Sequence, residues 1–298
     1  MNTTSTKPRC DDVTVANYIC CFIDILGQKD VYEGQGLMPQ FSCVGDRDAF
    51  TANVRRSLGP IFAIHTAARE NLEALGRQHT AGLSGELEEA AAKIRAHRIK
   101  CQRWSDGFVY FASLHNGDRE VVMNAAAIMM ALAGNFCLTA LSNRFALRGG
   151  IDISWGAEVY DEINGPVVAH AYELESVVAK YPRVVVSDRA VQFIRAYADA
   201  DTPLPVVGAV NKSFAMNALE LLAIDDGVAI VDYLGKGLSD AFASEAYCRK
   251  RANALRFAQD ELAKFSNQGD VKLTGRYERL LQYFKRSEIS GDKSCLKS

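Results

Sequence analysis

Apolar positions near the start of the chain form one continuous run, Ile19 to Ile23, and the next residue is an acid, Asp24. A short apolar run that is closed by a glycine, here Gly27, predicts a buried strand. Burying a carboxylate is costly unless a cationic group accompanies it. We therefore expect Asp24 to have a cationic partner at the end of this strand.

Two further strand-like runs lie between Ile99 and Leu114 and are joined at Ser105-Asp106-Gly107. An Asp-Gly pair between apolar runs is a strong signal for a hairpin turn. The pattern therefore predicts a β-hairpin that carries a second acid, Asp106, at its tip.

Between these strands the pattern becomes helical. Residues 46–75 place apolar side chains at helical spacing, and residues 84–97 open with Ser84, a capping residue type, followed by acids in the first turn. We expect two helices here, which form an insertion over about residues 45–97.

The segment from Val121 to Leu141 carries no charge and meets the length of about 20 residues that a membrane span needs. Three polar residues, Asn124, Asn135 and Thr139, interrupt it, and its small residues suit close packing on a sheet. We expect a buried helix of a soluble protein rather than a membrane span.

The rest of the chain alternates short strands and helices, and antiparallel hairpins interrupt the helices. This order favours an α+β fold over a parallel doubly wound sheet. The expected elements are a strand within 145–160 with a hairpin return, a helix of about 13 residues after Gly165-Pro166, a strand over 184–187, a helix capped at Ser187 or Asp188, a strand over 228–234, and helices from 239 onward, with 199–225 mixed.

Composition indicates an ordinary soluble globular protein. The chain has 298 residues, 48% of them hydrophobic, and a formal net charge of -2, so it has no general attraction for nucleic acids or acidic membranes. Its eight cysteines include no CxxC pair, and several lie inside apolar runs, as reduced core thiols do. The start of the chain lacks an export signal, so we expect a cytoplasmic protein.

The two acids suggest a chemistry when they are taken together. If their strands are neighbours, Asp24 and Asp106 converge and repel unless a magnesium or manganese ion lies between them. The turn after Asp24 carries Gly27 and Lys29, whose backbone and side-chain donors could hold phosphates. Either acid alone is more often structural, but the combination favours phosphoryl or nucleotidyl transfer.

Four motifs at this point resemble class III nucleotidyl cyclases. "FIDILGQKD" looks like their first metal motif, "RWSDGFVYF" resembles their hairpin with the second metal-binding Asp, "ALRGGIDISWG" is similar to their glycine-containing strand, and "NGPVVAHAYELES" resembles the loop and helix that close the active site. The "GP...AYELE...YPR" pattern is similar to the subset called Pycsar cyclases, bacterial antiphage enzymes that make cyclic pyrimidine mononucleotides.

The resemblance implies a fold and a domain arrangement. The fold would be α+β, a ferredoxin-like βαββαβ class III cyclase core with a helical insertion and a helical C-terminal extension. The domains would be a disordered leader over 1–16, a nucleotidyl cyclase catalytic domain over 17–235 and a helical extension over 236–298. Residues outside about 18–187 are not covered by the motifs.

The resemblance also implies an activity and partners. The chain would act as a head-to-tail homodimer with active sites at the interface and convert a nucleoside triphosphate into a 3',5'-cyclic monophosphate and pyrophosphate. A separate effector would sense the product in an antiphage defence system. No nucleic acid and no membrane would take part.

This sequence departs from the purine cyclases at positions that matter. Ala169 and Glu173 stand where those enzymes usually carry a transition-state Asn and Arg, and Gln102 stands where they commonly place a purine-reading Lys. A pyrimidine substrate is therefore favoured, with UTP ahead of CTP because uracil offers two carbonyls. A purine cyclase, a catalytically silent nucleotide-binding module and a nonenzymatic scaffold remain as alternatives.

The resemblance assigns the metal ligands. Two divalent ions, Mn²⁺ or Mg²⁺, would be held by Asp24, Asp106 and the backbone carbonyl of Ile25, which is the two-metal arrangement for in-line displacement. Gly27 and Lys29 would contact the phosphates. Loss of either acid should nearly abolish turnover.

Other residues are candidates for the transition state and for the base. Arg148 ranks first as the cation that stabilises the transition state, ahead of Arg183 and Arg103, although it could instead pair with a carboxylate across the dimer. Gln102 and Arg103 could read a pyrimidine edge through hydrogen bonds to its carbonyls.

Three aromatic residues near the motifs have simpler expected roles. Tyr172 could stack on the base or ribose, although packing is its more ordinary role. Trp104 and Trp155 are interpreted as core residues.

Overall fold

The computed structural model of this chain describes residues 13–26, 38–55, 59, 62, 63, 66, 99–104, 107–114, 121–200, 206–241 and 244–289. The expected helix over 84–97 and most of the second half of the helix over 46–75 lie outside these residues. Residues 44–55 are helical, as predicted for the start of the insertion.

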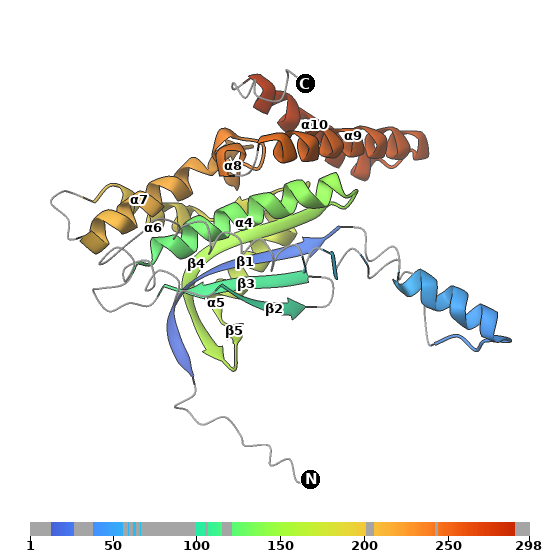
Figure 1. Ribbon diagram of the computed structural model, residues 1–298, viewed down its shortest axis with the longest axis horizontal. Coiled ribbons are helices and arrows are strands. Elements are labelled where there is room, and N and C mark those ends of the chain that lie inside the picture. The colour runs from blue at the N-terminus through green and yellow to red at the C-terminus, as the bar shows by residue number, and fades with distance from the viewer. Residues whose placement is uncertain are drawn as a thin grey trace, which may run out of the picture.

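One eight-stranded sheet forms the centre of the molecule (Figure 1). Its strand order is β2-β3-β1-β4-β6-β8-β7, and β5 pairs with β4 outside this path. The strands are β1 (Thr14–Ile25), β2 (Lys100–Trp104), β3 (Gly107–Ser113), β4 (Leu147–Val159), β5 (Glu162–Asn164), β6 (Val184–Val186), β7 (Leu222–Asp225) and β8 (Val228–Val231).

The pairings make this a mixed sheet. β1 runs antiparallel to both of its neighbours, β3 and β4, and β2 runs antiparallel to β3. β4 and β6 are parallel. The predicted α+β class and the predicted hairpin between Ile99 and Leu114 are confirmed. β1 begins at Thr14, inside the expected leader, because the long strand β4 pairs with it as far as Glu158.

Helices cover the sheet and form the C-terminal part of the chain. The long apolar helix and the helix capped by Ser187 occur as predicted, whereas α7 falls in a stretch where only mixed structure was expected. The helices are α4 (Met123–Ser142), α5 (Pro166–Glu173), the π-helical segment η2 (Leu174–Val178), α6 (Asp188–Ala198), α7 (Val206–Glu220), α8 (Lys236–Ala241), α9 (Ser244–Gln268) and α10 (Val271–Ile289).

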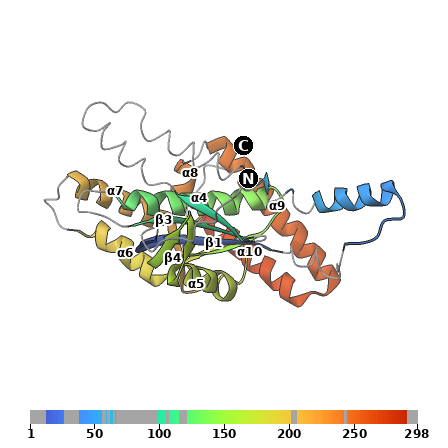
Figure 2. The same cartoon turned by 90° about the horizontal axis from the view of Figure 1, so that it is seen from below.

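Strand β1 is buried on both faces, which explains its unbroken apolar run. Ile19, Cys21 and Ile23 pack in the core that α4 completes, whereas Tyr18, Cys20 and Phe22 pack in a second cluster with residues of α5. Figure 2 shows the strands between α4 and α5. Since side chains alternate along a strand, Asp24 continues the series of Tyr18, Cys20 and Phe22 and belongs to the α5 face.

Helix α4 is an internal helix of this fold. It is long and apolar enough to cross a membrane, but 78% of its most apolar window is buried inside the molecule. Lys250 of α9 donates hydrogen bonds to Asn135 Oδ1 at 3.2 Å and Thr139 Oγ1 at 2.9 Å. Two of the polar residues that argued against a membrane span therefore serve helix packing, and the expectation of a buried helix is confirmed.

A glycine sets the approach of α5 to the sheet. A methyl group on Gly150 of β4 would lie 2.6 Å from Leu174 Cβ and would overlap the backbone oxygen of Ala171. Only a residue without a side chain lets α5 and η2 lie so close to β4. The double glycine in the sequence thus marks a close contact between a strand and a helix.

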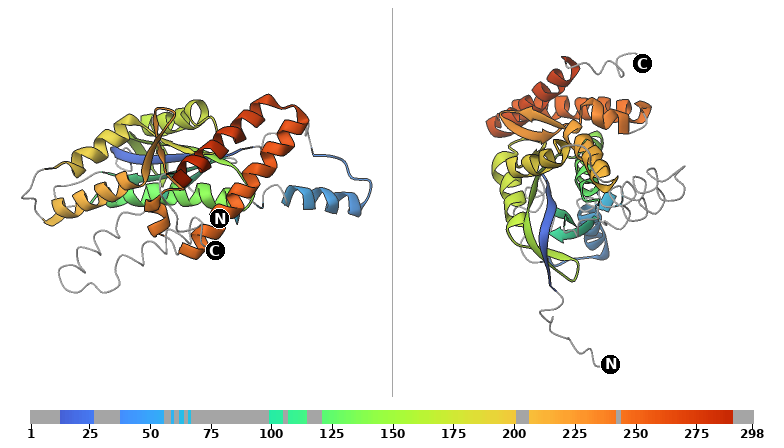
Figure 3. Two further views of the ribbon diagram at one scale, coloured as in Figure 1. Left: turned by 90° about the horizontal axis from the view of Figure 1, so that it is seen from above. Right: turned by 90° about the vertical axis from the view of Figure 1, so that its left-hand side faces the viewer.

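The C-terminal helices attach to the sheet and to α4. α9 packs on both α4 and α10, and Figure 3 shows α9 and α10 as a helical hairpin. Asp225 of β7 accepts hydrogen bonds from Arg183 and from Arg286 of α10, which ties the end of α10 to the sheet. The helical extension expected from residue 236 is present.

The cysteines match the expectation of reduced thiols only in part. Free thiols occur at Cys20, Cys21, Cys43, Cys101 and Cys137. Cys248 on α9 is disulfide-bonded instead. Burial raises the pKa of the Cys20 and Cys21 thiols, so they behave as apolar core residues rather than as nucleophiles.

Candidate functional site

Asp24 lies near the end of β1, between two strands that carry other predicted site residues. In the register of the sheet it pairs with Gly107 of β3 on one side and with Arg148 of β4 on the other. Gly107 directly follows Asp106 in the chain, and Asp106 itself lies outside the described residues. The Asp24 side chain is 26% exposed, so a ligand can reach it.

Arg148 is the cation that accompanies Asp24. Its Nη2 atom lies 3.9 Å from Asp24 Oδ2 and 2.7 Å from Glu175 Oε1, and the Glu175 side chain is only 3% exposed. Of these two ion pairs, the one between Arg148 and Glu175 is the closer. The buried Glu175 carboxylate therefore holds the Arg148 guanidinium beside Asp24. The contact between Arg148 and Asp24 is the looser of the two.

The π-helical segment η2 positions Glu175. It follows α5 directly, and the backbone N–H of Ala179 donates to the Leu174 oxygen at 2.9 Å, five residues back. Segments of this kind are rare and frequently occur at functional sites. Together with the contact at Gly150, η2 turns Glu175 toward the strand end while Val177 remains exposed.

A pocket of about 510 Å³ opens beside Asp24, and we call it the aromatic pocket. The Phe22 ring lies 6.1 Å from that of Trp104 and 5.3 Å from that of Tyr172, and the outer two residues are about half exposed. Exposed ring faces suit stacking with a flat base. The pocket is lined by Phe22, Asp24, Trp104, Gly107, Arg148, Tyr172, Glu175 and Ser176.

The core interpretation of the two tryptophans was wrong. Trp104 is 45% exposed and Trp155 is 53% exposed. Trp104 is the last residue of β2, an edge strand that has no further strand to cover it in the path of the sheet. The sequence signal for Trp104 was its place beside the hairpin turn.

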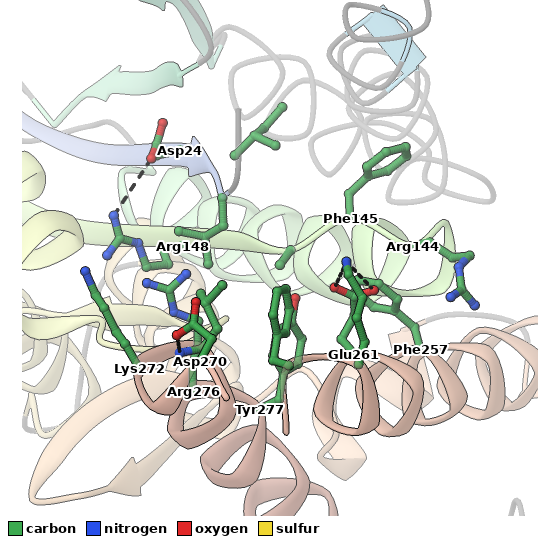
Figure 4. Close-up of a pocket in the computed structure, with 16 residues that line it drawn as sticks. Asp24, Arg144, Phe145, Arg148, Phe257, Glu261, Asp270, Lys272, Arg276 and Tyr277 are labelled. Carbon is green, nitrogen blue, oxygen red and sulfur yellow. Dashed lines mark hydrogen bonds and ion pairs between the residues drawn. The ribbon is translucent and has the colours of Figure 1, made fainter. Parts of the chain in front are cut away.

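A second pocket of about 780 Å³, here the basic pocket, lies between this strand end and the C-terminal helices (Figure 4). Five cationic and three acidic side chains line it, and it shares Asp24 and Arg148 with the aromatic pocket. Its lining residues are Asp24, Ile25, Leu26, Arg144, Phe145, Ala146, Arg148, Phe257, Glu261, Lys264, Phe265, Asp270, Lys272, Leu273, Arg276 and Tyr277.

Aromatic rings support the cations of the basic pocket. The Arg144 guanidinium lies 5.4 Å from the centre of the Phe257 ring, and Lys264 Nζ lies 4.6 Å from that of Phe265. Tyr277 stacks on Phe265 at 5.7 Å. Burial, with the Glu261 charge adding to it, raises the pKa of Tyr277 to about 12, so this phenol stays neutral.

The predicted site residues other than Gln102 and Arg103 divide into three groups. Asp24, Ile25, Arg148 and Tyr172 are brought together around the two pockets. Arg183 is not brought there: its side chain is 2% exposed and pairs with Asp225 at 2.7 Å. Gly27, Lys29 and Asp106 lie outside the described residues.

The two candidates for reading the base lie on β2. Gln102 Oε1 accepts a hydrogen bond from the Ile163 N–H at 2.9 Å, and Gln102 pairs with Val109, so it belongs to the α5 face. Arg103 pairs with Phe108, whose side chain packs on the α4 face, so Arg103 points to the opposite side of the sheet. Neither residue lines a pocket beside Asp24.

The described oxygen donors are of the kind that a hard divalent cation prefers. Asp24 and Ile25 are consecutive at the end of β1, and both line the basic pocket, whose cations suit phosphates. Magnesium is commonly held by one or two carboxylates, with substrate phosphates and water completing the shell. Among the described residues no group of three His, Cys, Asp or Glu side chains could hold a metal. Asp24 and the Ile25 carbonyl would therefore suit a metal, and Asp106, the second predicted carboxylate, lies outside the described residues.

A second polar cluster lies farther along the same face of β4 and is structural. Asp152, fully buried, accepts hydrogen bonds from Ser154 at 2.8 Å and Ser187 at 2.6 Å, and it pairs with Arg189 and His170. These partners come from β4, α5 and the start of α6. The cluster fastens the two helices to the strand and thereby fixes α5 over the aromatic pocket.

Sequence reasoning missed Glu175, Trp104 and the cations of the C-terminal helices. Glu175 lies within the motif "NGPVVAHAYELES", so its place could have been suspected, but its contact depends on the π-helical turn. Lys272 and Arg276 lie far along the chain from the motifs, and no local pattern links them to Asp24.

Comparison with known proteins gives no match: no family model, no curated protein and no solved structure matches this chain.

Proposed function

We propose that this protein is a metal-dependent pyrimidine nucleotide cyclase that converts UTP into 3',5'-cyclic UMP and pyrophosphate. The observation that carries the proposal is the register of Asp24 with Gly107, the neighbour of Asp106. Asp24 thus lies opposite the residue that directly follows the second acid of the motifs in the chain. Arg148, from the third motif, pairs with Asp24 from the other side.

The order of the strands supports the same proposal. A ferredoxin-like βαββαβ core runs strand, helix, hairpin, helix, strand, with the first strand between the third and the fourth. The chain has β1, the helical residues 44–55, β2, β3, α4 and β4, in the sheet order β2-β3-β1-β4 with antiparallel pairings. We propose that this unit is the cyclase core, and that the later strands and the C-terminal helices extend it.

In the proposed reaction the ribose 3'-oxygen loses its proton and bonds to the α-phosphorus, and the bond from that phosphorus to the bridging oxygen of the pyrophosphate breaks. Asp24, Asp106 and the Ile25 carbonyl would hold two Mn²⁺ or Mg²⁺ ions. Bound metal would activate the hydroxyl and neutralise the leaving group. Arg148, held by Glu175, would stabilise the charge on the reacting phosphate.

The aromatic pocket supports a role in holding the base. Trp104 and Tyr172 present exposed rings beside Asp24, and base stacking on such rings contributes about 1–3 kcal/mol per base. Gln102, whose amide oxygen accepts from the Ile163 N–H, lies outside the lining of the aromatic pocket, and its amide nitrogen remains a proposed donor to a uracil carbonyl. Gly27 and Lys29 remain proposed phosphate contacts.

We further propose a cytoplasmic homodimer with active sites at its interface and a separate effector that senses the cyclic product during antiphage defence. Exposed apolar side chains support a subunit contact, since such surface is typical of interfaces. Large examples are Val15, Trp104, Trp155, Tyr172 and Val177.

The test is to incubate the purified protein with Mn²⁺ and UTP, CTP, ATP or GTP separately, and to identify products by chromatography and mass. We expect cyclic UMP. Asp24→Asn should reduce the rate by several powers of ten, since each tenfold costs about 1.4 kcal/mol of barrier. Asp240→Asn, at an exposed acid on α8, is the matched control and should leave the rate unchanged.

Other outcomes would change the proposal in distinct ways. Cyclic CMP would make the enzyme a cytidylate cyclase, and a cyclic purine would remove the argument for pyrimidine selection. Nucleotide binding without any product would favour a silent cyclase-like module. A product that survives Asp24→Asn would contradict the metal assignment.

A further inference from the structure

The aromatic pocket and the basic pocket meet at Asp24 and Arg148, which line both. One side of this junction offers ring faces, and the other offers five cationic side chains. A ligand that fills both has a flat, partly apolar end and a polyanionic end. A nucleoside triphosphate has this division of chemistry.

Three of the five cations come from the C-terminal helices. On α9, Glu261 and Lys264 lie four and seven residues after Phe257, so they share one face of the helix. On α10, Lys272 and Arg276 lie four residues apart and share another face. Figure 4 shows Lys272 and Arg276 on α10 below the strand end that carries Arg148.

The geometry of the turn between the helices fixes these faces. Gly269 adopts a φ of 71°, and its N–H donates to the Ser266 oxygen at 3.2 Å. Asp270 Oδ1 then accepts from the Leu273 N–H at 2.9 Å and caps the start of α10. Lys272 therefore sits in the first turn of α10, directly at the mouth of the basic pocket.

Five cationic and three acidic side chains line the basic pocket, and two of the cations, Arg144 and Arg148, also have acid partners outside the lining, Asp260 and Glu175. Lys264 forms an ion pair with Glu261 at 3.1 Å, and Arg144 forms one with Asp260 at 2.9 Å. Lys272 is exposed and makes no ion pair with any residue that the structure describes. An excess of cations in a concave site raises the local concentration of anions.

We propose that the α9–α10 hairpin binds the polyphosphate tail of the nucleoside triphosphate, with Lys272 and Arg276 as phosphate-binding residues. The inference rests on the proposed function, because it assigns a part of the same substrate to the basic pocket. The C-terminal extension is then a component of the substrate site and not only a brace for α4.

The test is calorimetric titration of the full-length protein with UTP and, separately, with inorganic tripolyphosphate. Lys272→Glu should weaken both by about tenfold, the loss of one charge-assisted phosphate contact. Lys285→Glu, at an exposed lysine of the same helix that does not line the basic pocket, makes the same change of charge and should leave both affinities unchanged. In a competition titration, UTP should displace bound tripolyphosphate, whereas uridine should not.

Three results would overturn the inference: unchanged binding in Lys272→Glu, an equal loss in Lys285→Glu, or tripolyphosphate that UTP does not displace. None of these readouts needs turnover. If UTP and tripolyphosphate compete for binding but no cyclic product forms, the cyclase proposal is contradicted and the phosphate site is supported. If cyclic UMP forms and Lys272→Glu binds UTP and tripolyphosphate as the parent protein does, the cyclase proposal is supported and the phosphate site is contradicted.

Discussion

At the scale of single residues, the pairing of Arg148 with Glu175 decides how Asp24 can act. The guanidinium is attracted by two carboxylates but touches only Glu175 at hydrogen-bond distance. The Arg148 Nη2 atom stays 3.9 Å from Asp24 Oδ2, which is beyond hydrogen-bond distance. A strand-end acid in direct contact with an arginine would instead compete poorly for a metal.

Glu175→Gln should therefore disturb both stability and metal use. Arg148 loses a buried counter-charge, which should lower the free energy of unfolding by about 2–3 kcal/mol. The arginine should then pair with Asp24, so that the proposed cyclase activity should require more Mn²⁺. Urea denaturation and the Mn²⁺ dependence of product formation measure the two effects.

Glu173→Gln is the control, because Glu173 is exposed on the neighbouring turn and should change neither quantity. If Glu175→Gln alters stability but leaves the Mn²⁺ dependence unchanged, Arg148 does not compete at Asp24.

At the scale of elements, the contact of α5 and η2 with β4 holds the aromatic pocket together. Gly150 makes this contact possible, and the Asp152 cluster fastens it from the same face. Tyr172 and Glu175, which line the aromatic pocket, both depend on this placement.

Gly150→Ala should destabilise the protein by about 2 kcal/mol, because the new methyl group meets backbone that cannot rotate away. Gly275→Ala is the contrast: no atom lies within 4 Å of the added carbon, and the residue is inside α10. There the change should stabilise by about 0.5–1 kcal/mol. Equal effects in thermal unfolding would refute the packing argument.

Elements with a local signal were predictable from the sequence. The apolar run of β1, the Asp-Gly hairpin, the uncharged α4 and the Ser187 cap are all set by residues close together in the chain. The sequence could also name Asp24 and Arg148, because each lies in a short motif. The orientation of Glu175 depends on a π-helical turn, and the partner of Arg183 is Asp225, which is 42 residues away in the chain. Such contacts depend on tertiary packing, which no local pattern encodes.

At the scale of the whole molecule, several tyrosines are buried where core and C-terminal helices meet. Burial raises the pKa of Tyr277 to about 12. Tyr18, which packs with α5 on the other face of the sheet, also has its pKa raised to about 12, again mainly by burial. Tyr283 and Tyr233 are shifted upward too, mainly by burial, and their rings pack at 5.0 Å.

Stability should therefore fall in alkali. Below pH 10, the ordinary pKa of tyrosine, these phenols are neutral in both states and their contribution is complete. Between pH 10 and about 12 the unfolded chain releases protons that folded Tyr277 retains, so unfolding is favoured as pH rises.

Urea midpoints measured across this range should decline, and Tyr277→Phe should reduce the slope. Tyr160→Phe, at an exposed position, is the control and should leave the slope unchanged. A midpoint that stays constant up to pH 12 in the parent protein would contradict the burial of these phenols.

The start of α4 has a consequence for synthesis. Its first N–H groups have no cap from their own helix; instead Asn211 Oδ1 of α7 accepts from Val122 N at 2.8 Å and Met123 N at 3.0 Å. The central helix is therefore completed by a residue that the ribosome adds almost ninety positions later. A nascent chain that already contains β1 to β4 lacks this acceptor for the first amides of α4 until α7 has been synthesised.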